Sequence, residues 1–281
     1  ASVGGGIPII RSLNHALTAD EIEEITGILN GTTNYMMTKM FYEGADYEEV
    51  LKEAQEHGYA ERNPEADVEG YDACRKIAIL SSIISGRYVD FEDIYTEGIT
   101  KVTSTDMKYA KKLGMTIKLL ASVKRDQDKL GAIVAPCLLS ASHPLYSIDS
   151  VFNAVFVRGN ALGDAMFYGS GAGKLPTASA VAADIVDAVK NADKNVMASW
   201  TTPKLTLEDR ADTEKKFFVR MSGDLDEWLP KVEKAFGEVT TAAPDDVTGE
   251  FGFVTGKIKE GFYEEKAAGF PNILQMLRVE E

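Results

Sequence analysis

Between residues 18 and 86, apolar residues recur at intervals of three and four positions, which is the spacing of one helix face. Two polar pairs in this region, Thr18 with Glu21 and Asp46 with Glu49, have the spacing of a capping box, in which two side chains satisfy free N–H groups at a helix start. The pattern therefore predicts several packed helices over residues 18–86.

The pattern then changes to two strand-like runs of apolar residues, at 117–124 and 130–139. The polar segment 125–128 between them suits a hairpin. A second pair of runs, 154–158 and 164–168, flanks a turn that contains glycine and asparagine. An antiparallel sheet with helices on one face is the simplest arrangement of these elements.

After a glycine-rich loop at 169–173, an apolar helix is predicted over 177–192, and the polar residues 194–214 resemble a connector. The rest of the chain has the element order of a βαββαβ module. Its predicted strands and helices are, in order, 216–221, 226–236, 238–242, 251–258, 260–268 and 273–279. We therefore expect an α+β fold of two parts, an antiparallel sheet covered by helices in residues 1–193 and a smaller ferredoxin-like domain in residues 215–281.

The chain has 44 acidic and 30 basic side chains, which gives a formal net charge of −14. Binding to nucleic acid or to an anionic membrane relies on Lys and Arg, so we expect neither partner. No apolar run approaches the roughly 20 residues that cross a bilayer, and the N-terminus has no secretory signal. Two cysteines, Cys74 and Cys137, are present without a CxxC spacing, which fits a reducing cytoplasm.

The stretch from Gly58 to Lys76 contains the most candidate chemistry, because a turn-rich loop dense in carboxylates leads into an apolar helix. If that helix begins near Asp67, then Asp72 and Lys76 lie four positions apart on one face. A surface ion pair is the ordinary interpretation of such a spacing. However, the apolar run 77–80 predicts a mostly buried helix, and a buried lysine beside a carboxylate can serve as a general acid or base. The nearby carboxylates would suit the ammonium group of an amino-acid substrate.

Several motifs of this sequence resemble those of the homoserine dehydrogenase family, and they occur in the family's order. They are SVGGGIPII at 2–10, GILNGTTNY at 27–35, GYAE at 58–61, DVEGYD at 67–72, Arg75-Lys76, HPL at 143–145, GAG at 171–173 and PTA at 176–178. The resemblance implies a reversible, NAD- or NADP-dependent interconversion of L-homoserine and L-aspartate 4-semialdehyde in threonine, methionine and isoleucine biosynthesis.

The resemblance also assigns roles to individual residues. By it, Lys76 is the general acid or base and Asp72 is its carboxylate partner. The other implied site residues are Glu61, Asp67, Asn30, Gly31 and Thr32 for the substrate, and Thr33 and Gly173 for the cofactor. A cationic Lys76 near the substrate oxygen would stabilise developing negative charge and supply a proton during reduction. In the oxidative direction the neutral amine would remove that proton.

Three further expectations follow from the resemblance. A Rossmann domain would precede Ala1 and receive residues 169–193, so the 281 residues are expected to lack dehydrogenase activity on their own. A monovalent cation such as sodium would bind the main-chain carbonyls of Val3, Gly5 and Ile7; its glutamate ligand would also precede Ala1, so this site is expected to be incomplete. A homodimer or higher homo-oligomer is expected.

Residues 215–281 resemble an ACT domain, a module that can mediate feedback by a threonine effector in this pathway. In an ACT domain a Pro-Gly or similar glycine usually follows the first strand, and here SGDLD at 222–226 takes its place. The alternative is therefore that residues 215–281 have a purely structural role. A non-catalytic amino-acid-sensing protein would explain this module without Lys76. A phosphate-loop hydrolase is disfavoured, because the loop at 169–173 lacks the required spacing and the Ser or Thr after its lysine.

Overall fold

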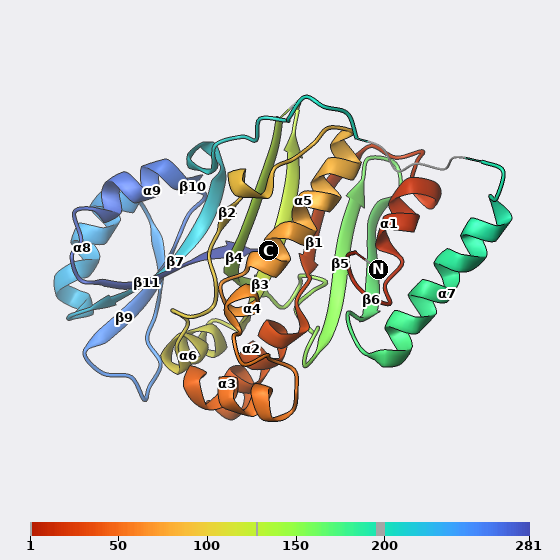
Figure 1. The fold of residues 1–281 in the computed structure, drawn as a ribbon. Coiled ribbons are helices and arrows are strands. Elements are labelled where there is room, and N and C mark those ends of the chain that lie inside the picture. The colour runs from red at the N-terminus through yellow and green to blue at the C-terminus, as the bar shows by residue number, and fades with distance from the viewer. Residues whose placement is uncertain (1, 128, 195–199) are drawn as a thin grey trace.

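The computed structural model describes residues 2–127, 129–194 and 200–281. In this part of the chain a sheet of eleven strands has the order β6-β5-β1-β3-β4-β11-β7-β9-β8, with short β2 and β10 beside β4 and β7 (Figure 1). The strands are β1 (Ile22–Ile28), β2 (Tyr95–Thr96), β3 (Met115–Asp126), β4 (Lys129–Ser140), β5 (Phe152–Gly159), β6 (Gly163–Ser170), β7 (Glu214–Ser222), β8 (Val239–Ala242), β9 (Glu250–Thr255), β10 (Ile258–Lys259) and β11 (Ile273–Glu280). Most neighbours pair antiparallel, which confirms the expected mixed fold with a large antiparallel sheet.

Helices α2, α5 and α6 contact β3 and cover one face of the sheet (Figure 1). The helices are α1 (Ile9–Arg11), α2 (Gly31–Glu43), α3 (Tyr47–Glu56), α4 (Glu65–Val68), α5 (Tyr71–Ser85), α6 (Ser104–Lys112), α7 (Lys174–Lys190), α8 (Leu225–Phe236) and α9 (Glu260–Ala267). The main core lies under these helices and includes Met36 and Leu119, whereas Leu120 points to a smaller core on the other face with Leu145 and Ile148. In the ranges described, none of the helices is long and apolar enough to cross a bilayer.

Residues 22–28 differ from the helical prediction, because they form β1 between β3 and β5. Every residue of β1 except Glu23 is buried. A strand that is covered on both faces shows no alternation of apolar and polar positions, so its sequence carries no strand signal. The predicted capping box of Thr18 and Glu21 is therefore wrong.

Two other helix starts are near their predicted positions but are built differently. α3 begins at Tyr47, yet Asp46 does not cap it; its carboxylate accepts a hydrogen bond from Ser104 Oγ at 2.7 Å. α7 begins at Lys174, directly after Gly173, so it starts three residues earlier than predicted.

The C-terminal part has the predicted element order, and its strands lie in the antiparallel order β11-β7-β9-β8 that is typical of a ferredoxin-like fold. The predicted strand 251–258 is divided into two strands. β9 ends at Thr255, and Ile258 belongs to the separate short strand β10, where it pairs with Lys215 of β7. β11 also pairs in parallel with β4, with Arg278 opposite Cys137. The two parts therefore share one continuous sheet, which the sequence does not predict.

The predicted connector 194–214 packs along the end of α5 where it is described. Thr201 N–H donates to the carbonyl of Gly86, and Leu205 N–H donates to the carbonyl of Tyr88, both at 2.8 Å. Residues 195–199 of this connector lie outside the described residues, as does Asp128 of the predicted hairpin turn.

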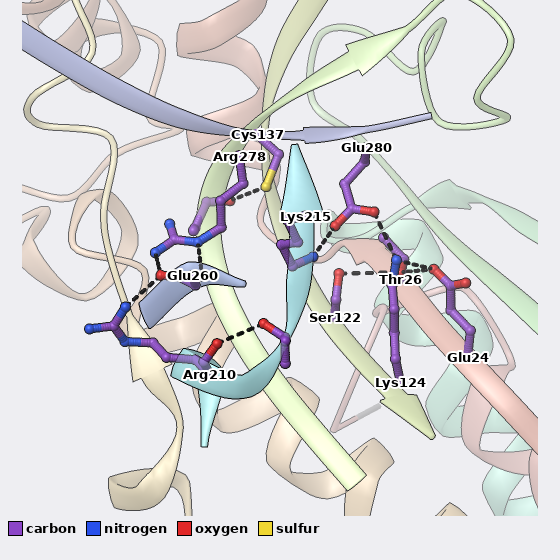
Figure 2. A network of polar contacts seen from close by, with 12 residues as sticks. Glu24, Thr26, Ser122, Lys124, Cys137, Arg210, Lys215, Glu260, Arg278 and Glu280 are labelled. Carbon is purple, nitrogen blue, oxygen red and sulfur yellow. Dashed lines mark hydrogen bonds and ion pairs between the residues drawn. The ribbon is translucent and has the colours of Figure 1, made fainter. Parts of the chain in front are cut away.

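A network of buried and partly buried charges joins β11 to its neighbours (Figure 2). Arg278 is 1% exposed and donates to both carboxylate oxygens of Glu260, at 3.0 and 2.5 Å. Arg210 donates to the same carboxylate at 2.5 Å. Glu280 lies two residues after Arg278 on β11. Its carboxylate accepts a hydrogen bond from Lys215 and another, at 2.8 Å, from Lys124. The network thus links β11 with β3, β7 and α9.

Replacing Glu280 by glutamine is expected to lower stability at neutral pH, and this loss should shrink as the pH falls. Burial of the carboxyl raises its pKa, but the charges of Lys215 and Lys124 outweigh burial and lower the pKa to about 2. A carboxylate whose pKa is lowered on folding stabilises the protein above its unfolded pKa of roughly 4.3, and this contribution is lost as the pH falls toward the folded value.

Urea unfolding at a series of pH values measures this difference. It should reach up to about 3 kcal/mol near neutral pH and decrease below about pH 4.5. Glu281→Gln is the matched control, because Glu281 also pairs with a lysine but has a side chain that is 53% exposed. A Glu280→Gln difference that stays constant with pH would contradict the assigned cause.

Candidate active site

Lys76 and Asp72 form an ion pair on α5, with 2.5 Å between Lys76 Nζ and Asp72 Oδ2. The helix begins at Tyr71 and not near Asp67, because Gly70 adopts a left-handed φ of 80° that separates α4 from α5. Asp72 and Lys76 nevertheless lie four positions apart on one helix face, as the sequence indicates.

The Lys76 ammonium group is also held from the sheet side. It donates to the carbonyl of Leu29, just after β1, at 2.9 Å. The side chains of Lys76 and Asp72 are 22% and 33% exposed. This cation is therefore fixed by two acceptors while part of its surface stays accessible to a small molecule.

Asn30 is buried and connects the two carboxylates of the site. Its Nδ2 donates to Asp67 Oδ1 at 2.7 Å and to Asp72 Oδ2 at 3.0 Å. Its Oδ1 accepts from the backbone N–H of Thr33 at 2.9 Å, which caps the start of α2, and from the Thr33 hydroxyl at 3.1 Å. The helix start thus fixes the position of both aspartates relative to Lys76.

The site carries an excess of negative charge. Burial raises the pKa of Asp67; the hydrogen bond from Asn30 acts in the opposite direction, and the charges of Asp72 and Glu61 raise it further. The carboxylates of Asp72 and Glu61 therefore lie near that of Asp67, and Asp72 pairs with the Lys76 ammonium group. Such a site favours a ligand that brings its own positive charge.

The loop that contains Tyr59 and Glu61 lies beside Thr32 at the start of α2. The Thr32 hydroxyl donates to the carbonyl of Tyr59 at 2.6 Å, and the Tyr59 ring packs edge-on against Tyr35 with centroids 4.9 Å apart. The Glu61 carbonyl accepts from Gln55 at 3.1 Å, while its side chain is exposed. The loop therefore lies beside the start of α2 at Tyr59, and the Glu61 carboxylate is near enough to Asp67 for its charge to raise the Asp67 pKa.

Thr33 differs from its neighbours, because its side chain is 1% exposed and its hydroxyl bonds Asn30. In this structure it positions Asn30, and a direct cofactor contact stays a prediction. Gly31 has no space for a side chain, since a Cβ atom there would lie 2.7 Å from the Val151 carbonyl oxygen. The backbone of the segment around residue 151 therefore closes this side of the helix start.

The glycine-rich segments near both ends of the predicted catalytic region pack against each other. A Cβ atom on Gly5 would lie 1.9 Å from the Gly171 carbonyl oxygen, and Gly6 N–H donates to Ser170 at 3.1 Å. Gly173 has a φ of 112° and precedes α7. Within the described ranges, no group of three or more His, Cys, Asp or Glu residues could hold a metal ion. A cation on the main-chain carbonyls of Val3, Gly5 and Ile7 stays a prediction.

Sequence reasoning missed the parts of the site that depend on distant segments. The carbonyl of Leu29 is a backbone feature without a residue-type signal, whereas Asn30 is a preferred N-cap residue type that could have indicated the start of α2. Asn153, whose buried amide lies beside Gly31 and Gly171, was also not singled out. In an isolated strand an asparagine gives no indication of the loop that packs on it.

Comparison with known proteins gives consistent results. A family model for homoserine dehydrogenase matches residues 8–186. The chain is 50% identical over 191 residues to a homoserine dehydrogenase of Bacillus subtilis and 51% identical over 193 residues to one of Synechocystis sp.. These alignments cover 68% and 67% of this chain but 44% and 45% of the relatives. The chain therefore spans about half the length of the curated relatives it matches.

Solved structures show the same likeness, one of them over nearly the whole chain. A homoserine dehydrogenase from Thiobacillus denitrificans is 34% identical and superposes with a TM-score of 0.88 over 99% of this chain and 69% of its own. A hyperthermophilic archaeal homoserine dehydrogenase in complex with NADPH is 32% identical, with a TM-score of 0.58 over 67% of this chain and 54% of its own.

Proposed function

Because this chain belongs to the homoserine dehydrogenase family, we propose that it carries the substrate-binding and proton-transfer residues of an NAD(P)-dependent oxidoreductase that interconverts L-homoserine and L-aspartate 4-semialdehyde. One observation carries the proposal. Lys76 is fixed between Asp72 and the Leu29 carbonyl, within a cluster of carboxylates joined by Asn30. This arrangement combines a proton donor with a binding place for an ammonium group.

In the proposed reaction the nicotinamide cofactor supplies or accepts the hydride at the carbon that bears oxygen. Lys76 Nζ acts at that oxygen. During reduction the ammonium form stabilises the growing negative charge and donates a proton, and during oxidation the neutral amine accepts the proton. Asp72 holds the Lys76 side chain in place, because both lie on the same helix face.

The carboxylates account for the amino-acid nature of the substrate. Glu61 and Asp67 would receive the ammonium group, and Asn30, Gly31 and Thr32 would approach the substrate from the helix start. A partly buried carboxylate such as Asp67 interacts with a cation more strongly than a fully solvated one does.

Gly173 and Thr33 are the residues of this chain proposed to lie at the cofactor. At Gly31 and Gly171 a Cβ atom would collide with Val151 and Asn153, so the backbone on either side of the proposed cofactor residues packs closely against the start of β5. An archaeal relative was solved in complex with NADPH, which supports a nicotinamide cofactor for this chain.

α7 is proposed to pack against a nucleotide-binding domain. This helix of 17 residues has no buried residue, and Leu175, Ile185 and Val189 are 78%, 60% and 71% exposed. A helix with so many exposed apolar side chains requires a partner surface. A Rossmann domain that binds the cofactor fits this requirement.

Finer features of the resemblance are proposed on the same basis. They are a cytoplasmic location, a sodium-type cation on the carbonyls of Val3, Gly5 and Ile7, a homodimer or higher oligomer, and an ACT role for residues 215–281 with threonine as effector. The ferredoxin-like strand order supports the last of these. Light scattering and thermal unfolding, each with and without sodium or threonine, would test the cation, the oligomer and the effector.

The experiment on the function uses the complete enzyme, meaning these 281 residues together with a nucleotide-binding domain. We expect homoserine-dependent reduction of NAD or NADP, and a loss of roughly a hundredfold or more in kcat/KM with 4-hydroxybutyrate, which lacks the ammonium group that the carboxylates bind. An enzyme that binds homoserine without any reduction of cofactor would favour the amino-acid-sensing alternative.

A further inference from the structure

Asn153 lies at the start of β5, opposite Gly169 of β6, and is 2% exposed. Two backbone segments of the proposed site enclose its side-chain amide. A Cβ atom on Gly171 would lie 2.3 Å from Asn153 Cγ, and a Cβ atom on Gly31 would lie 3.4 Å from Asn153 Oδ1. The amide therefore lies between the loop that ends at Gly173 and the start of α2.

This amide has no hydrogen-bond partner among the residues that the structure describes. Its Oδ1 is buried without a hydrogen-bond donor. A buried polar group without a partner lowers stability, so the fold alone gives no reason for an asparagine here. Asn34 is equally buried and its Oδ1 also lacks a donor, but its Nδ2 donates to the carbonyls of Ile148 and Phe152, both at 3.1 Å.

Gly171 leaves the space that the Asn153 amide occupies. Its φ does not lie in the left-handed region, so the backbone conformation itself does not require glycine. A side chain at this position would instead displace the Asn153 amide, because the first carbon would overlap it. The loop at Gly171 and the Asn153 amide are therefore in close contact, and this contact requires a residue without a side chain at position 171.

We propose that the Asn153 amide binds the carboxamide of the nicotinamide ring, a proposal that rests on the proposed function. A carboxamide offers one acceptor and two donors, which is the complement of an asparagine side chain, so the two amides pair through reciprocal hydrogen bonds. The charged groups of the substrate have other partners in Lys76 and the carboxylates. An uncharged amide between the predicted cofactor residue Gly173 and the start of α2 matches the uncharged carboxamide. Asn153 is then a positioning residue for the ring.

The test compares two cofactors in the complete enzyme. One is the natural oxidised cofactor, and the other is its 3-acetylpyridine analogue, in which a methyl group replaces the amide NH2. Dissociation constants are measured by calorimetry for the wild type, for Asn153→Leu and for Gly171→Ala. The wild type should bind the natural cofactor about three- to tenfold more tightly than the analogue, the usual strength of one hydrogen bond. Both variants should bind the two cofactors equally.

Thermal unfolding separates this role from a structural one. Asn153→Leu should leave the melting temperature unchanged or raise it, because it removes an unpaired buried amide without changing the side-chain size much. Asn34→Leu is the matched control and should lower the melting temperature while the ratio of the two dissociation constants stays at the wild-type value.

Two results would overturn the proposal. One is a wild-type ratio of one, and the other is a ratio that Asn153→Leu and Gly171→Ala leave unchanged. If Asn153→Leu does not fold, the ratio measured for Gly171→Ala decides. Homoserine-dependent activity of the wild type is recorded separately, so loss of the cofactor preference would not be confused with failure of the proposed function.

Discussion

Replacement of Lys76 by alanine is expected to lower the turnover number of the complete enzyme by about two to four orders of magnitude, which is the usual contribution of a positioned proton donor. The side chain is fixed by Asp72 and by the Leu29 carbonyl, at 2.5 and 2.9 Å, so its ammonium group is held in one position. Cofactor affinity should change much less. Steady-state kinetics in which homoserine and cofactor are each varied measures both quantities.

Lys52→Ala is the matched control, because Lys52 also faces a carboxylate four positions away, at 4.0 Å from Glu56, but is 79% exposed. It should keep turnover near the wild-type value. If Lys76 formed only an ordinary ion pair, its replacement would cost at most about 1 kcal/mol of stability and leave turnover nearly intact. Near-normal turnover of a folded Lys76→Ala enzyme would remove this lysine from the mechanism.

Replacement of Glu260 by alanine is expected to destabilise the protein by about 3–5 kcal/mol, the usual cost of removing one member of a buried ion pair. Glu260 is 0% exposed, and its carboxylate is the shared acceptor of Arg278 and Arg210 (Figure 2). Without it, the guanidinium group of Arg278 stays buried at 1% exposure and keeps only its bond to Glu97, at 3.1 Å. Urea unfolding at neutral pH measures the loss.

Glu264→Ala supplies the control from the same helix. Its carboxylate pairs with Arg210 at 2.6 Å but its side chain is 45% exposed, so this change should cost at most about 1 kcal/mol. Because β11 joins the C-terminal part to β4, the Glu260→Ala protein should unfold in one transition at lower urea concentration. An equal loss for both variants would show that burial does not strengthen the Glu260 pair.

Most local elements could be predicted from the sequence. The hairpin of β3 and β4, the pair β5 and β6, and the order of the βαββαβ module follow from runs of apolar residues and the turns between them. The ion pair of Asp72 and Lys76 was also predictable, because four residues of helix bring two side chains together whatever the rest of the chain does.

Tertiary structure alone decided the features that join distant segments. β1 has no strand signal because it is buried on both faces at the centre of the sheet. The continuity of the sheet depends on β11 reaching β4, and the active-site geometry depends on Asn30 reaching both Asp67 and Asp72. The unpaired amide of Asn153 is visible only once Gly31 and Gly171 lie beside it. The sequence by itself determined which residues repeat with helix or strand spacing, because that spacing is local, whereas packing between segments far apart in the chain decided which of them share a site.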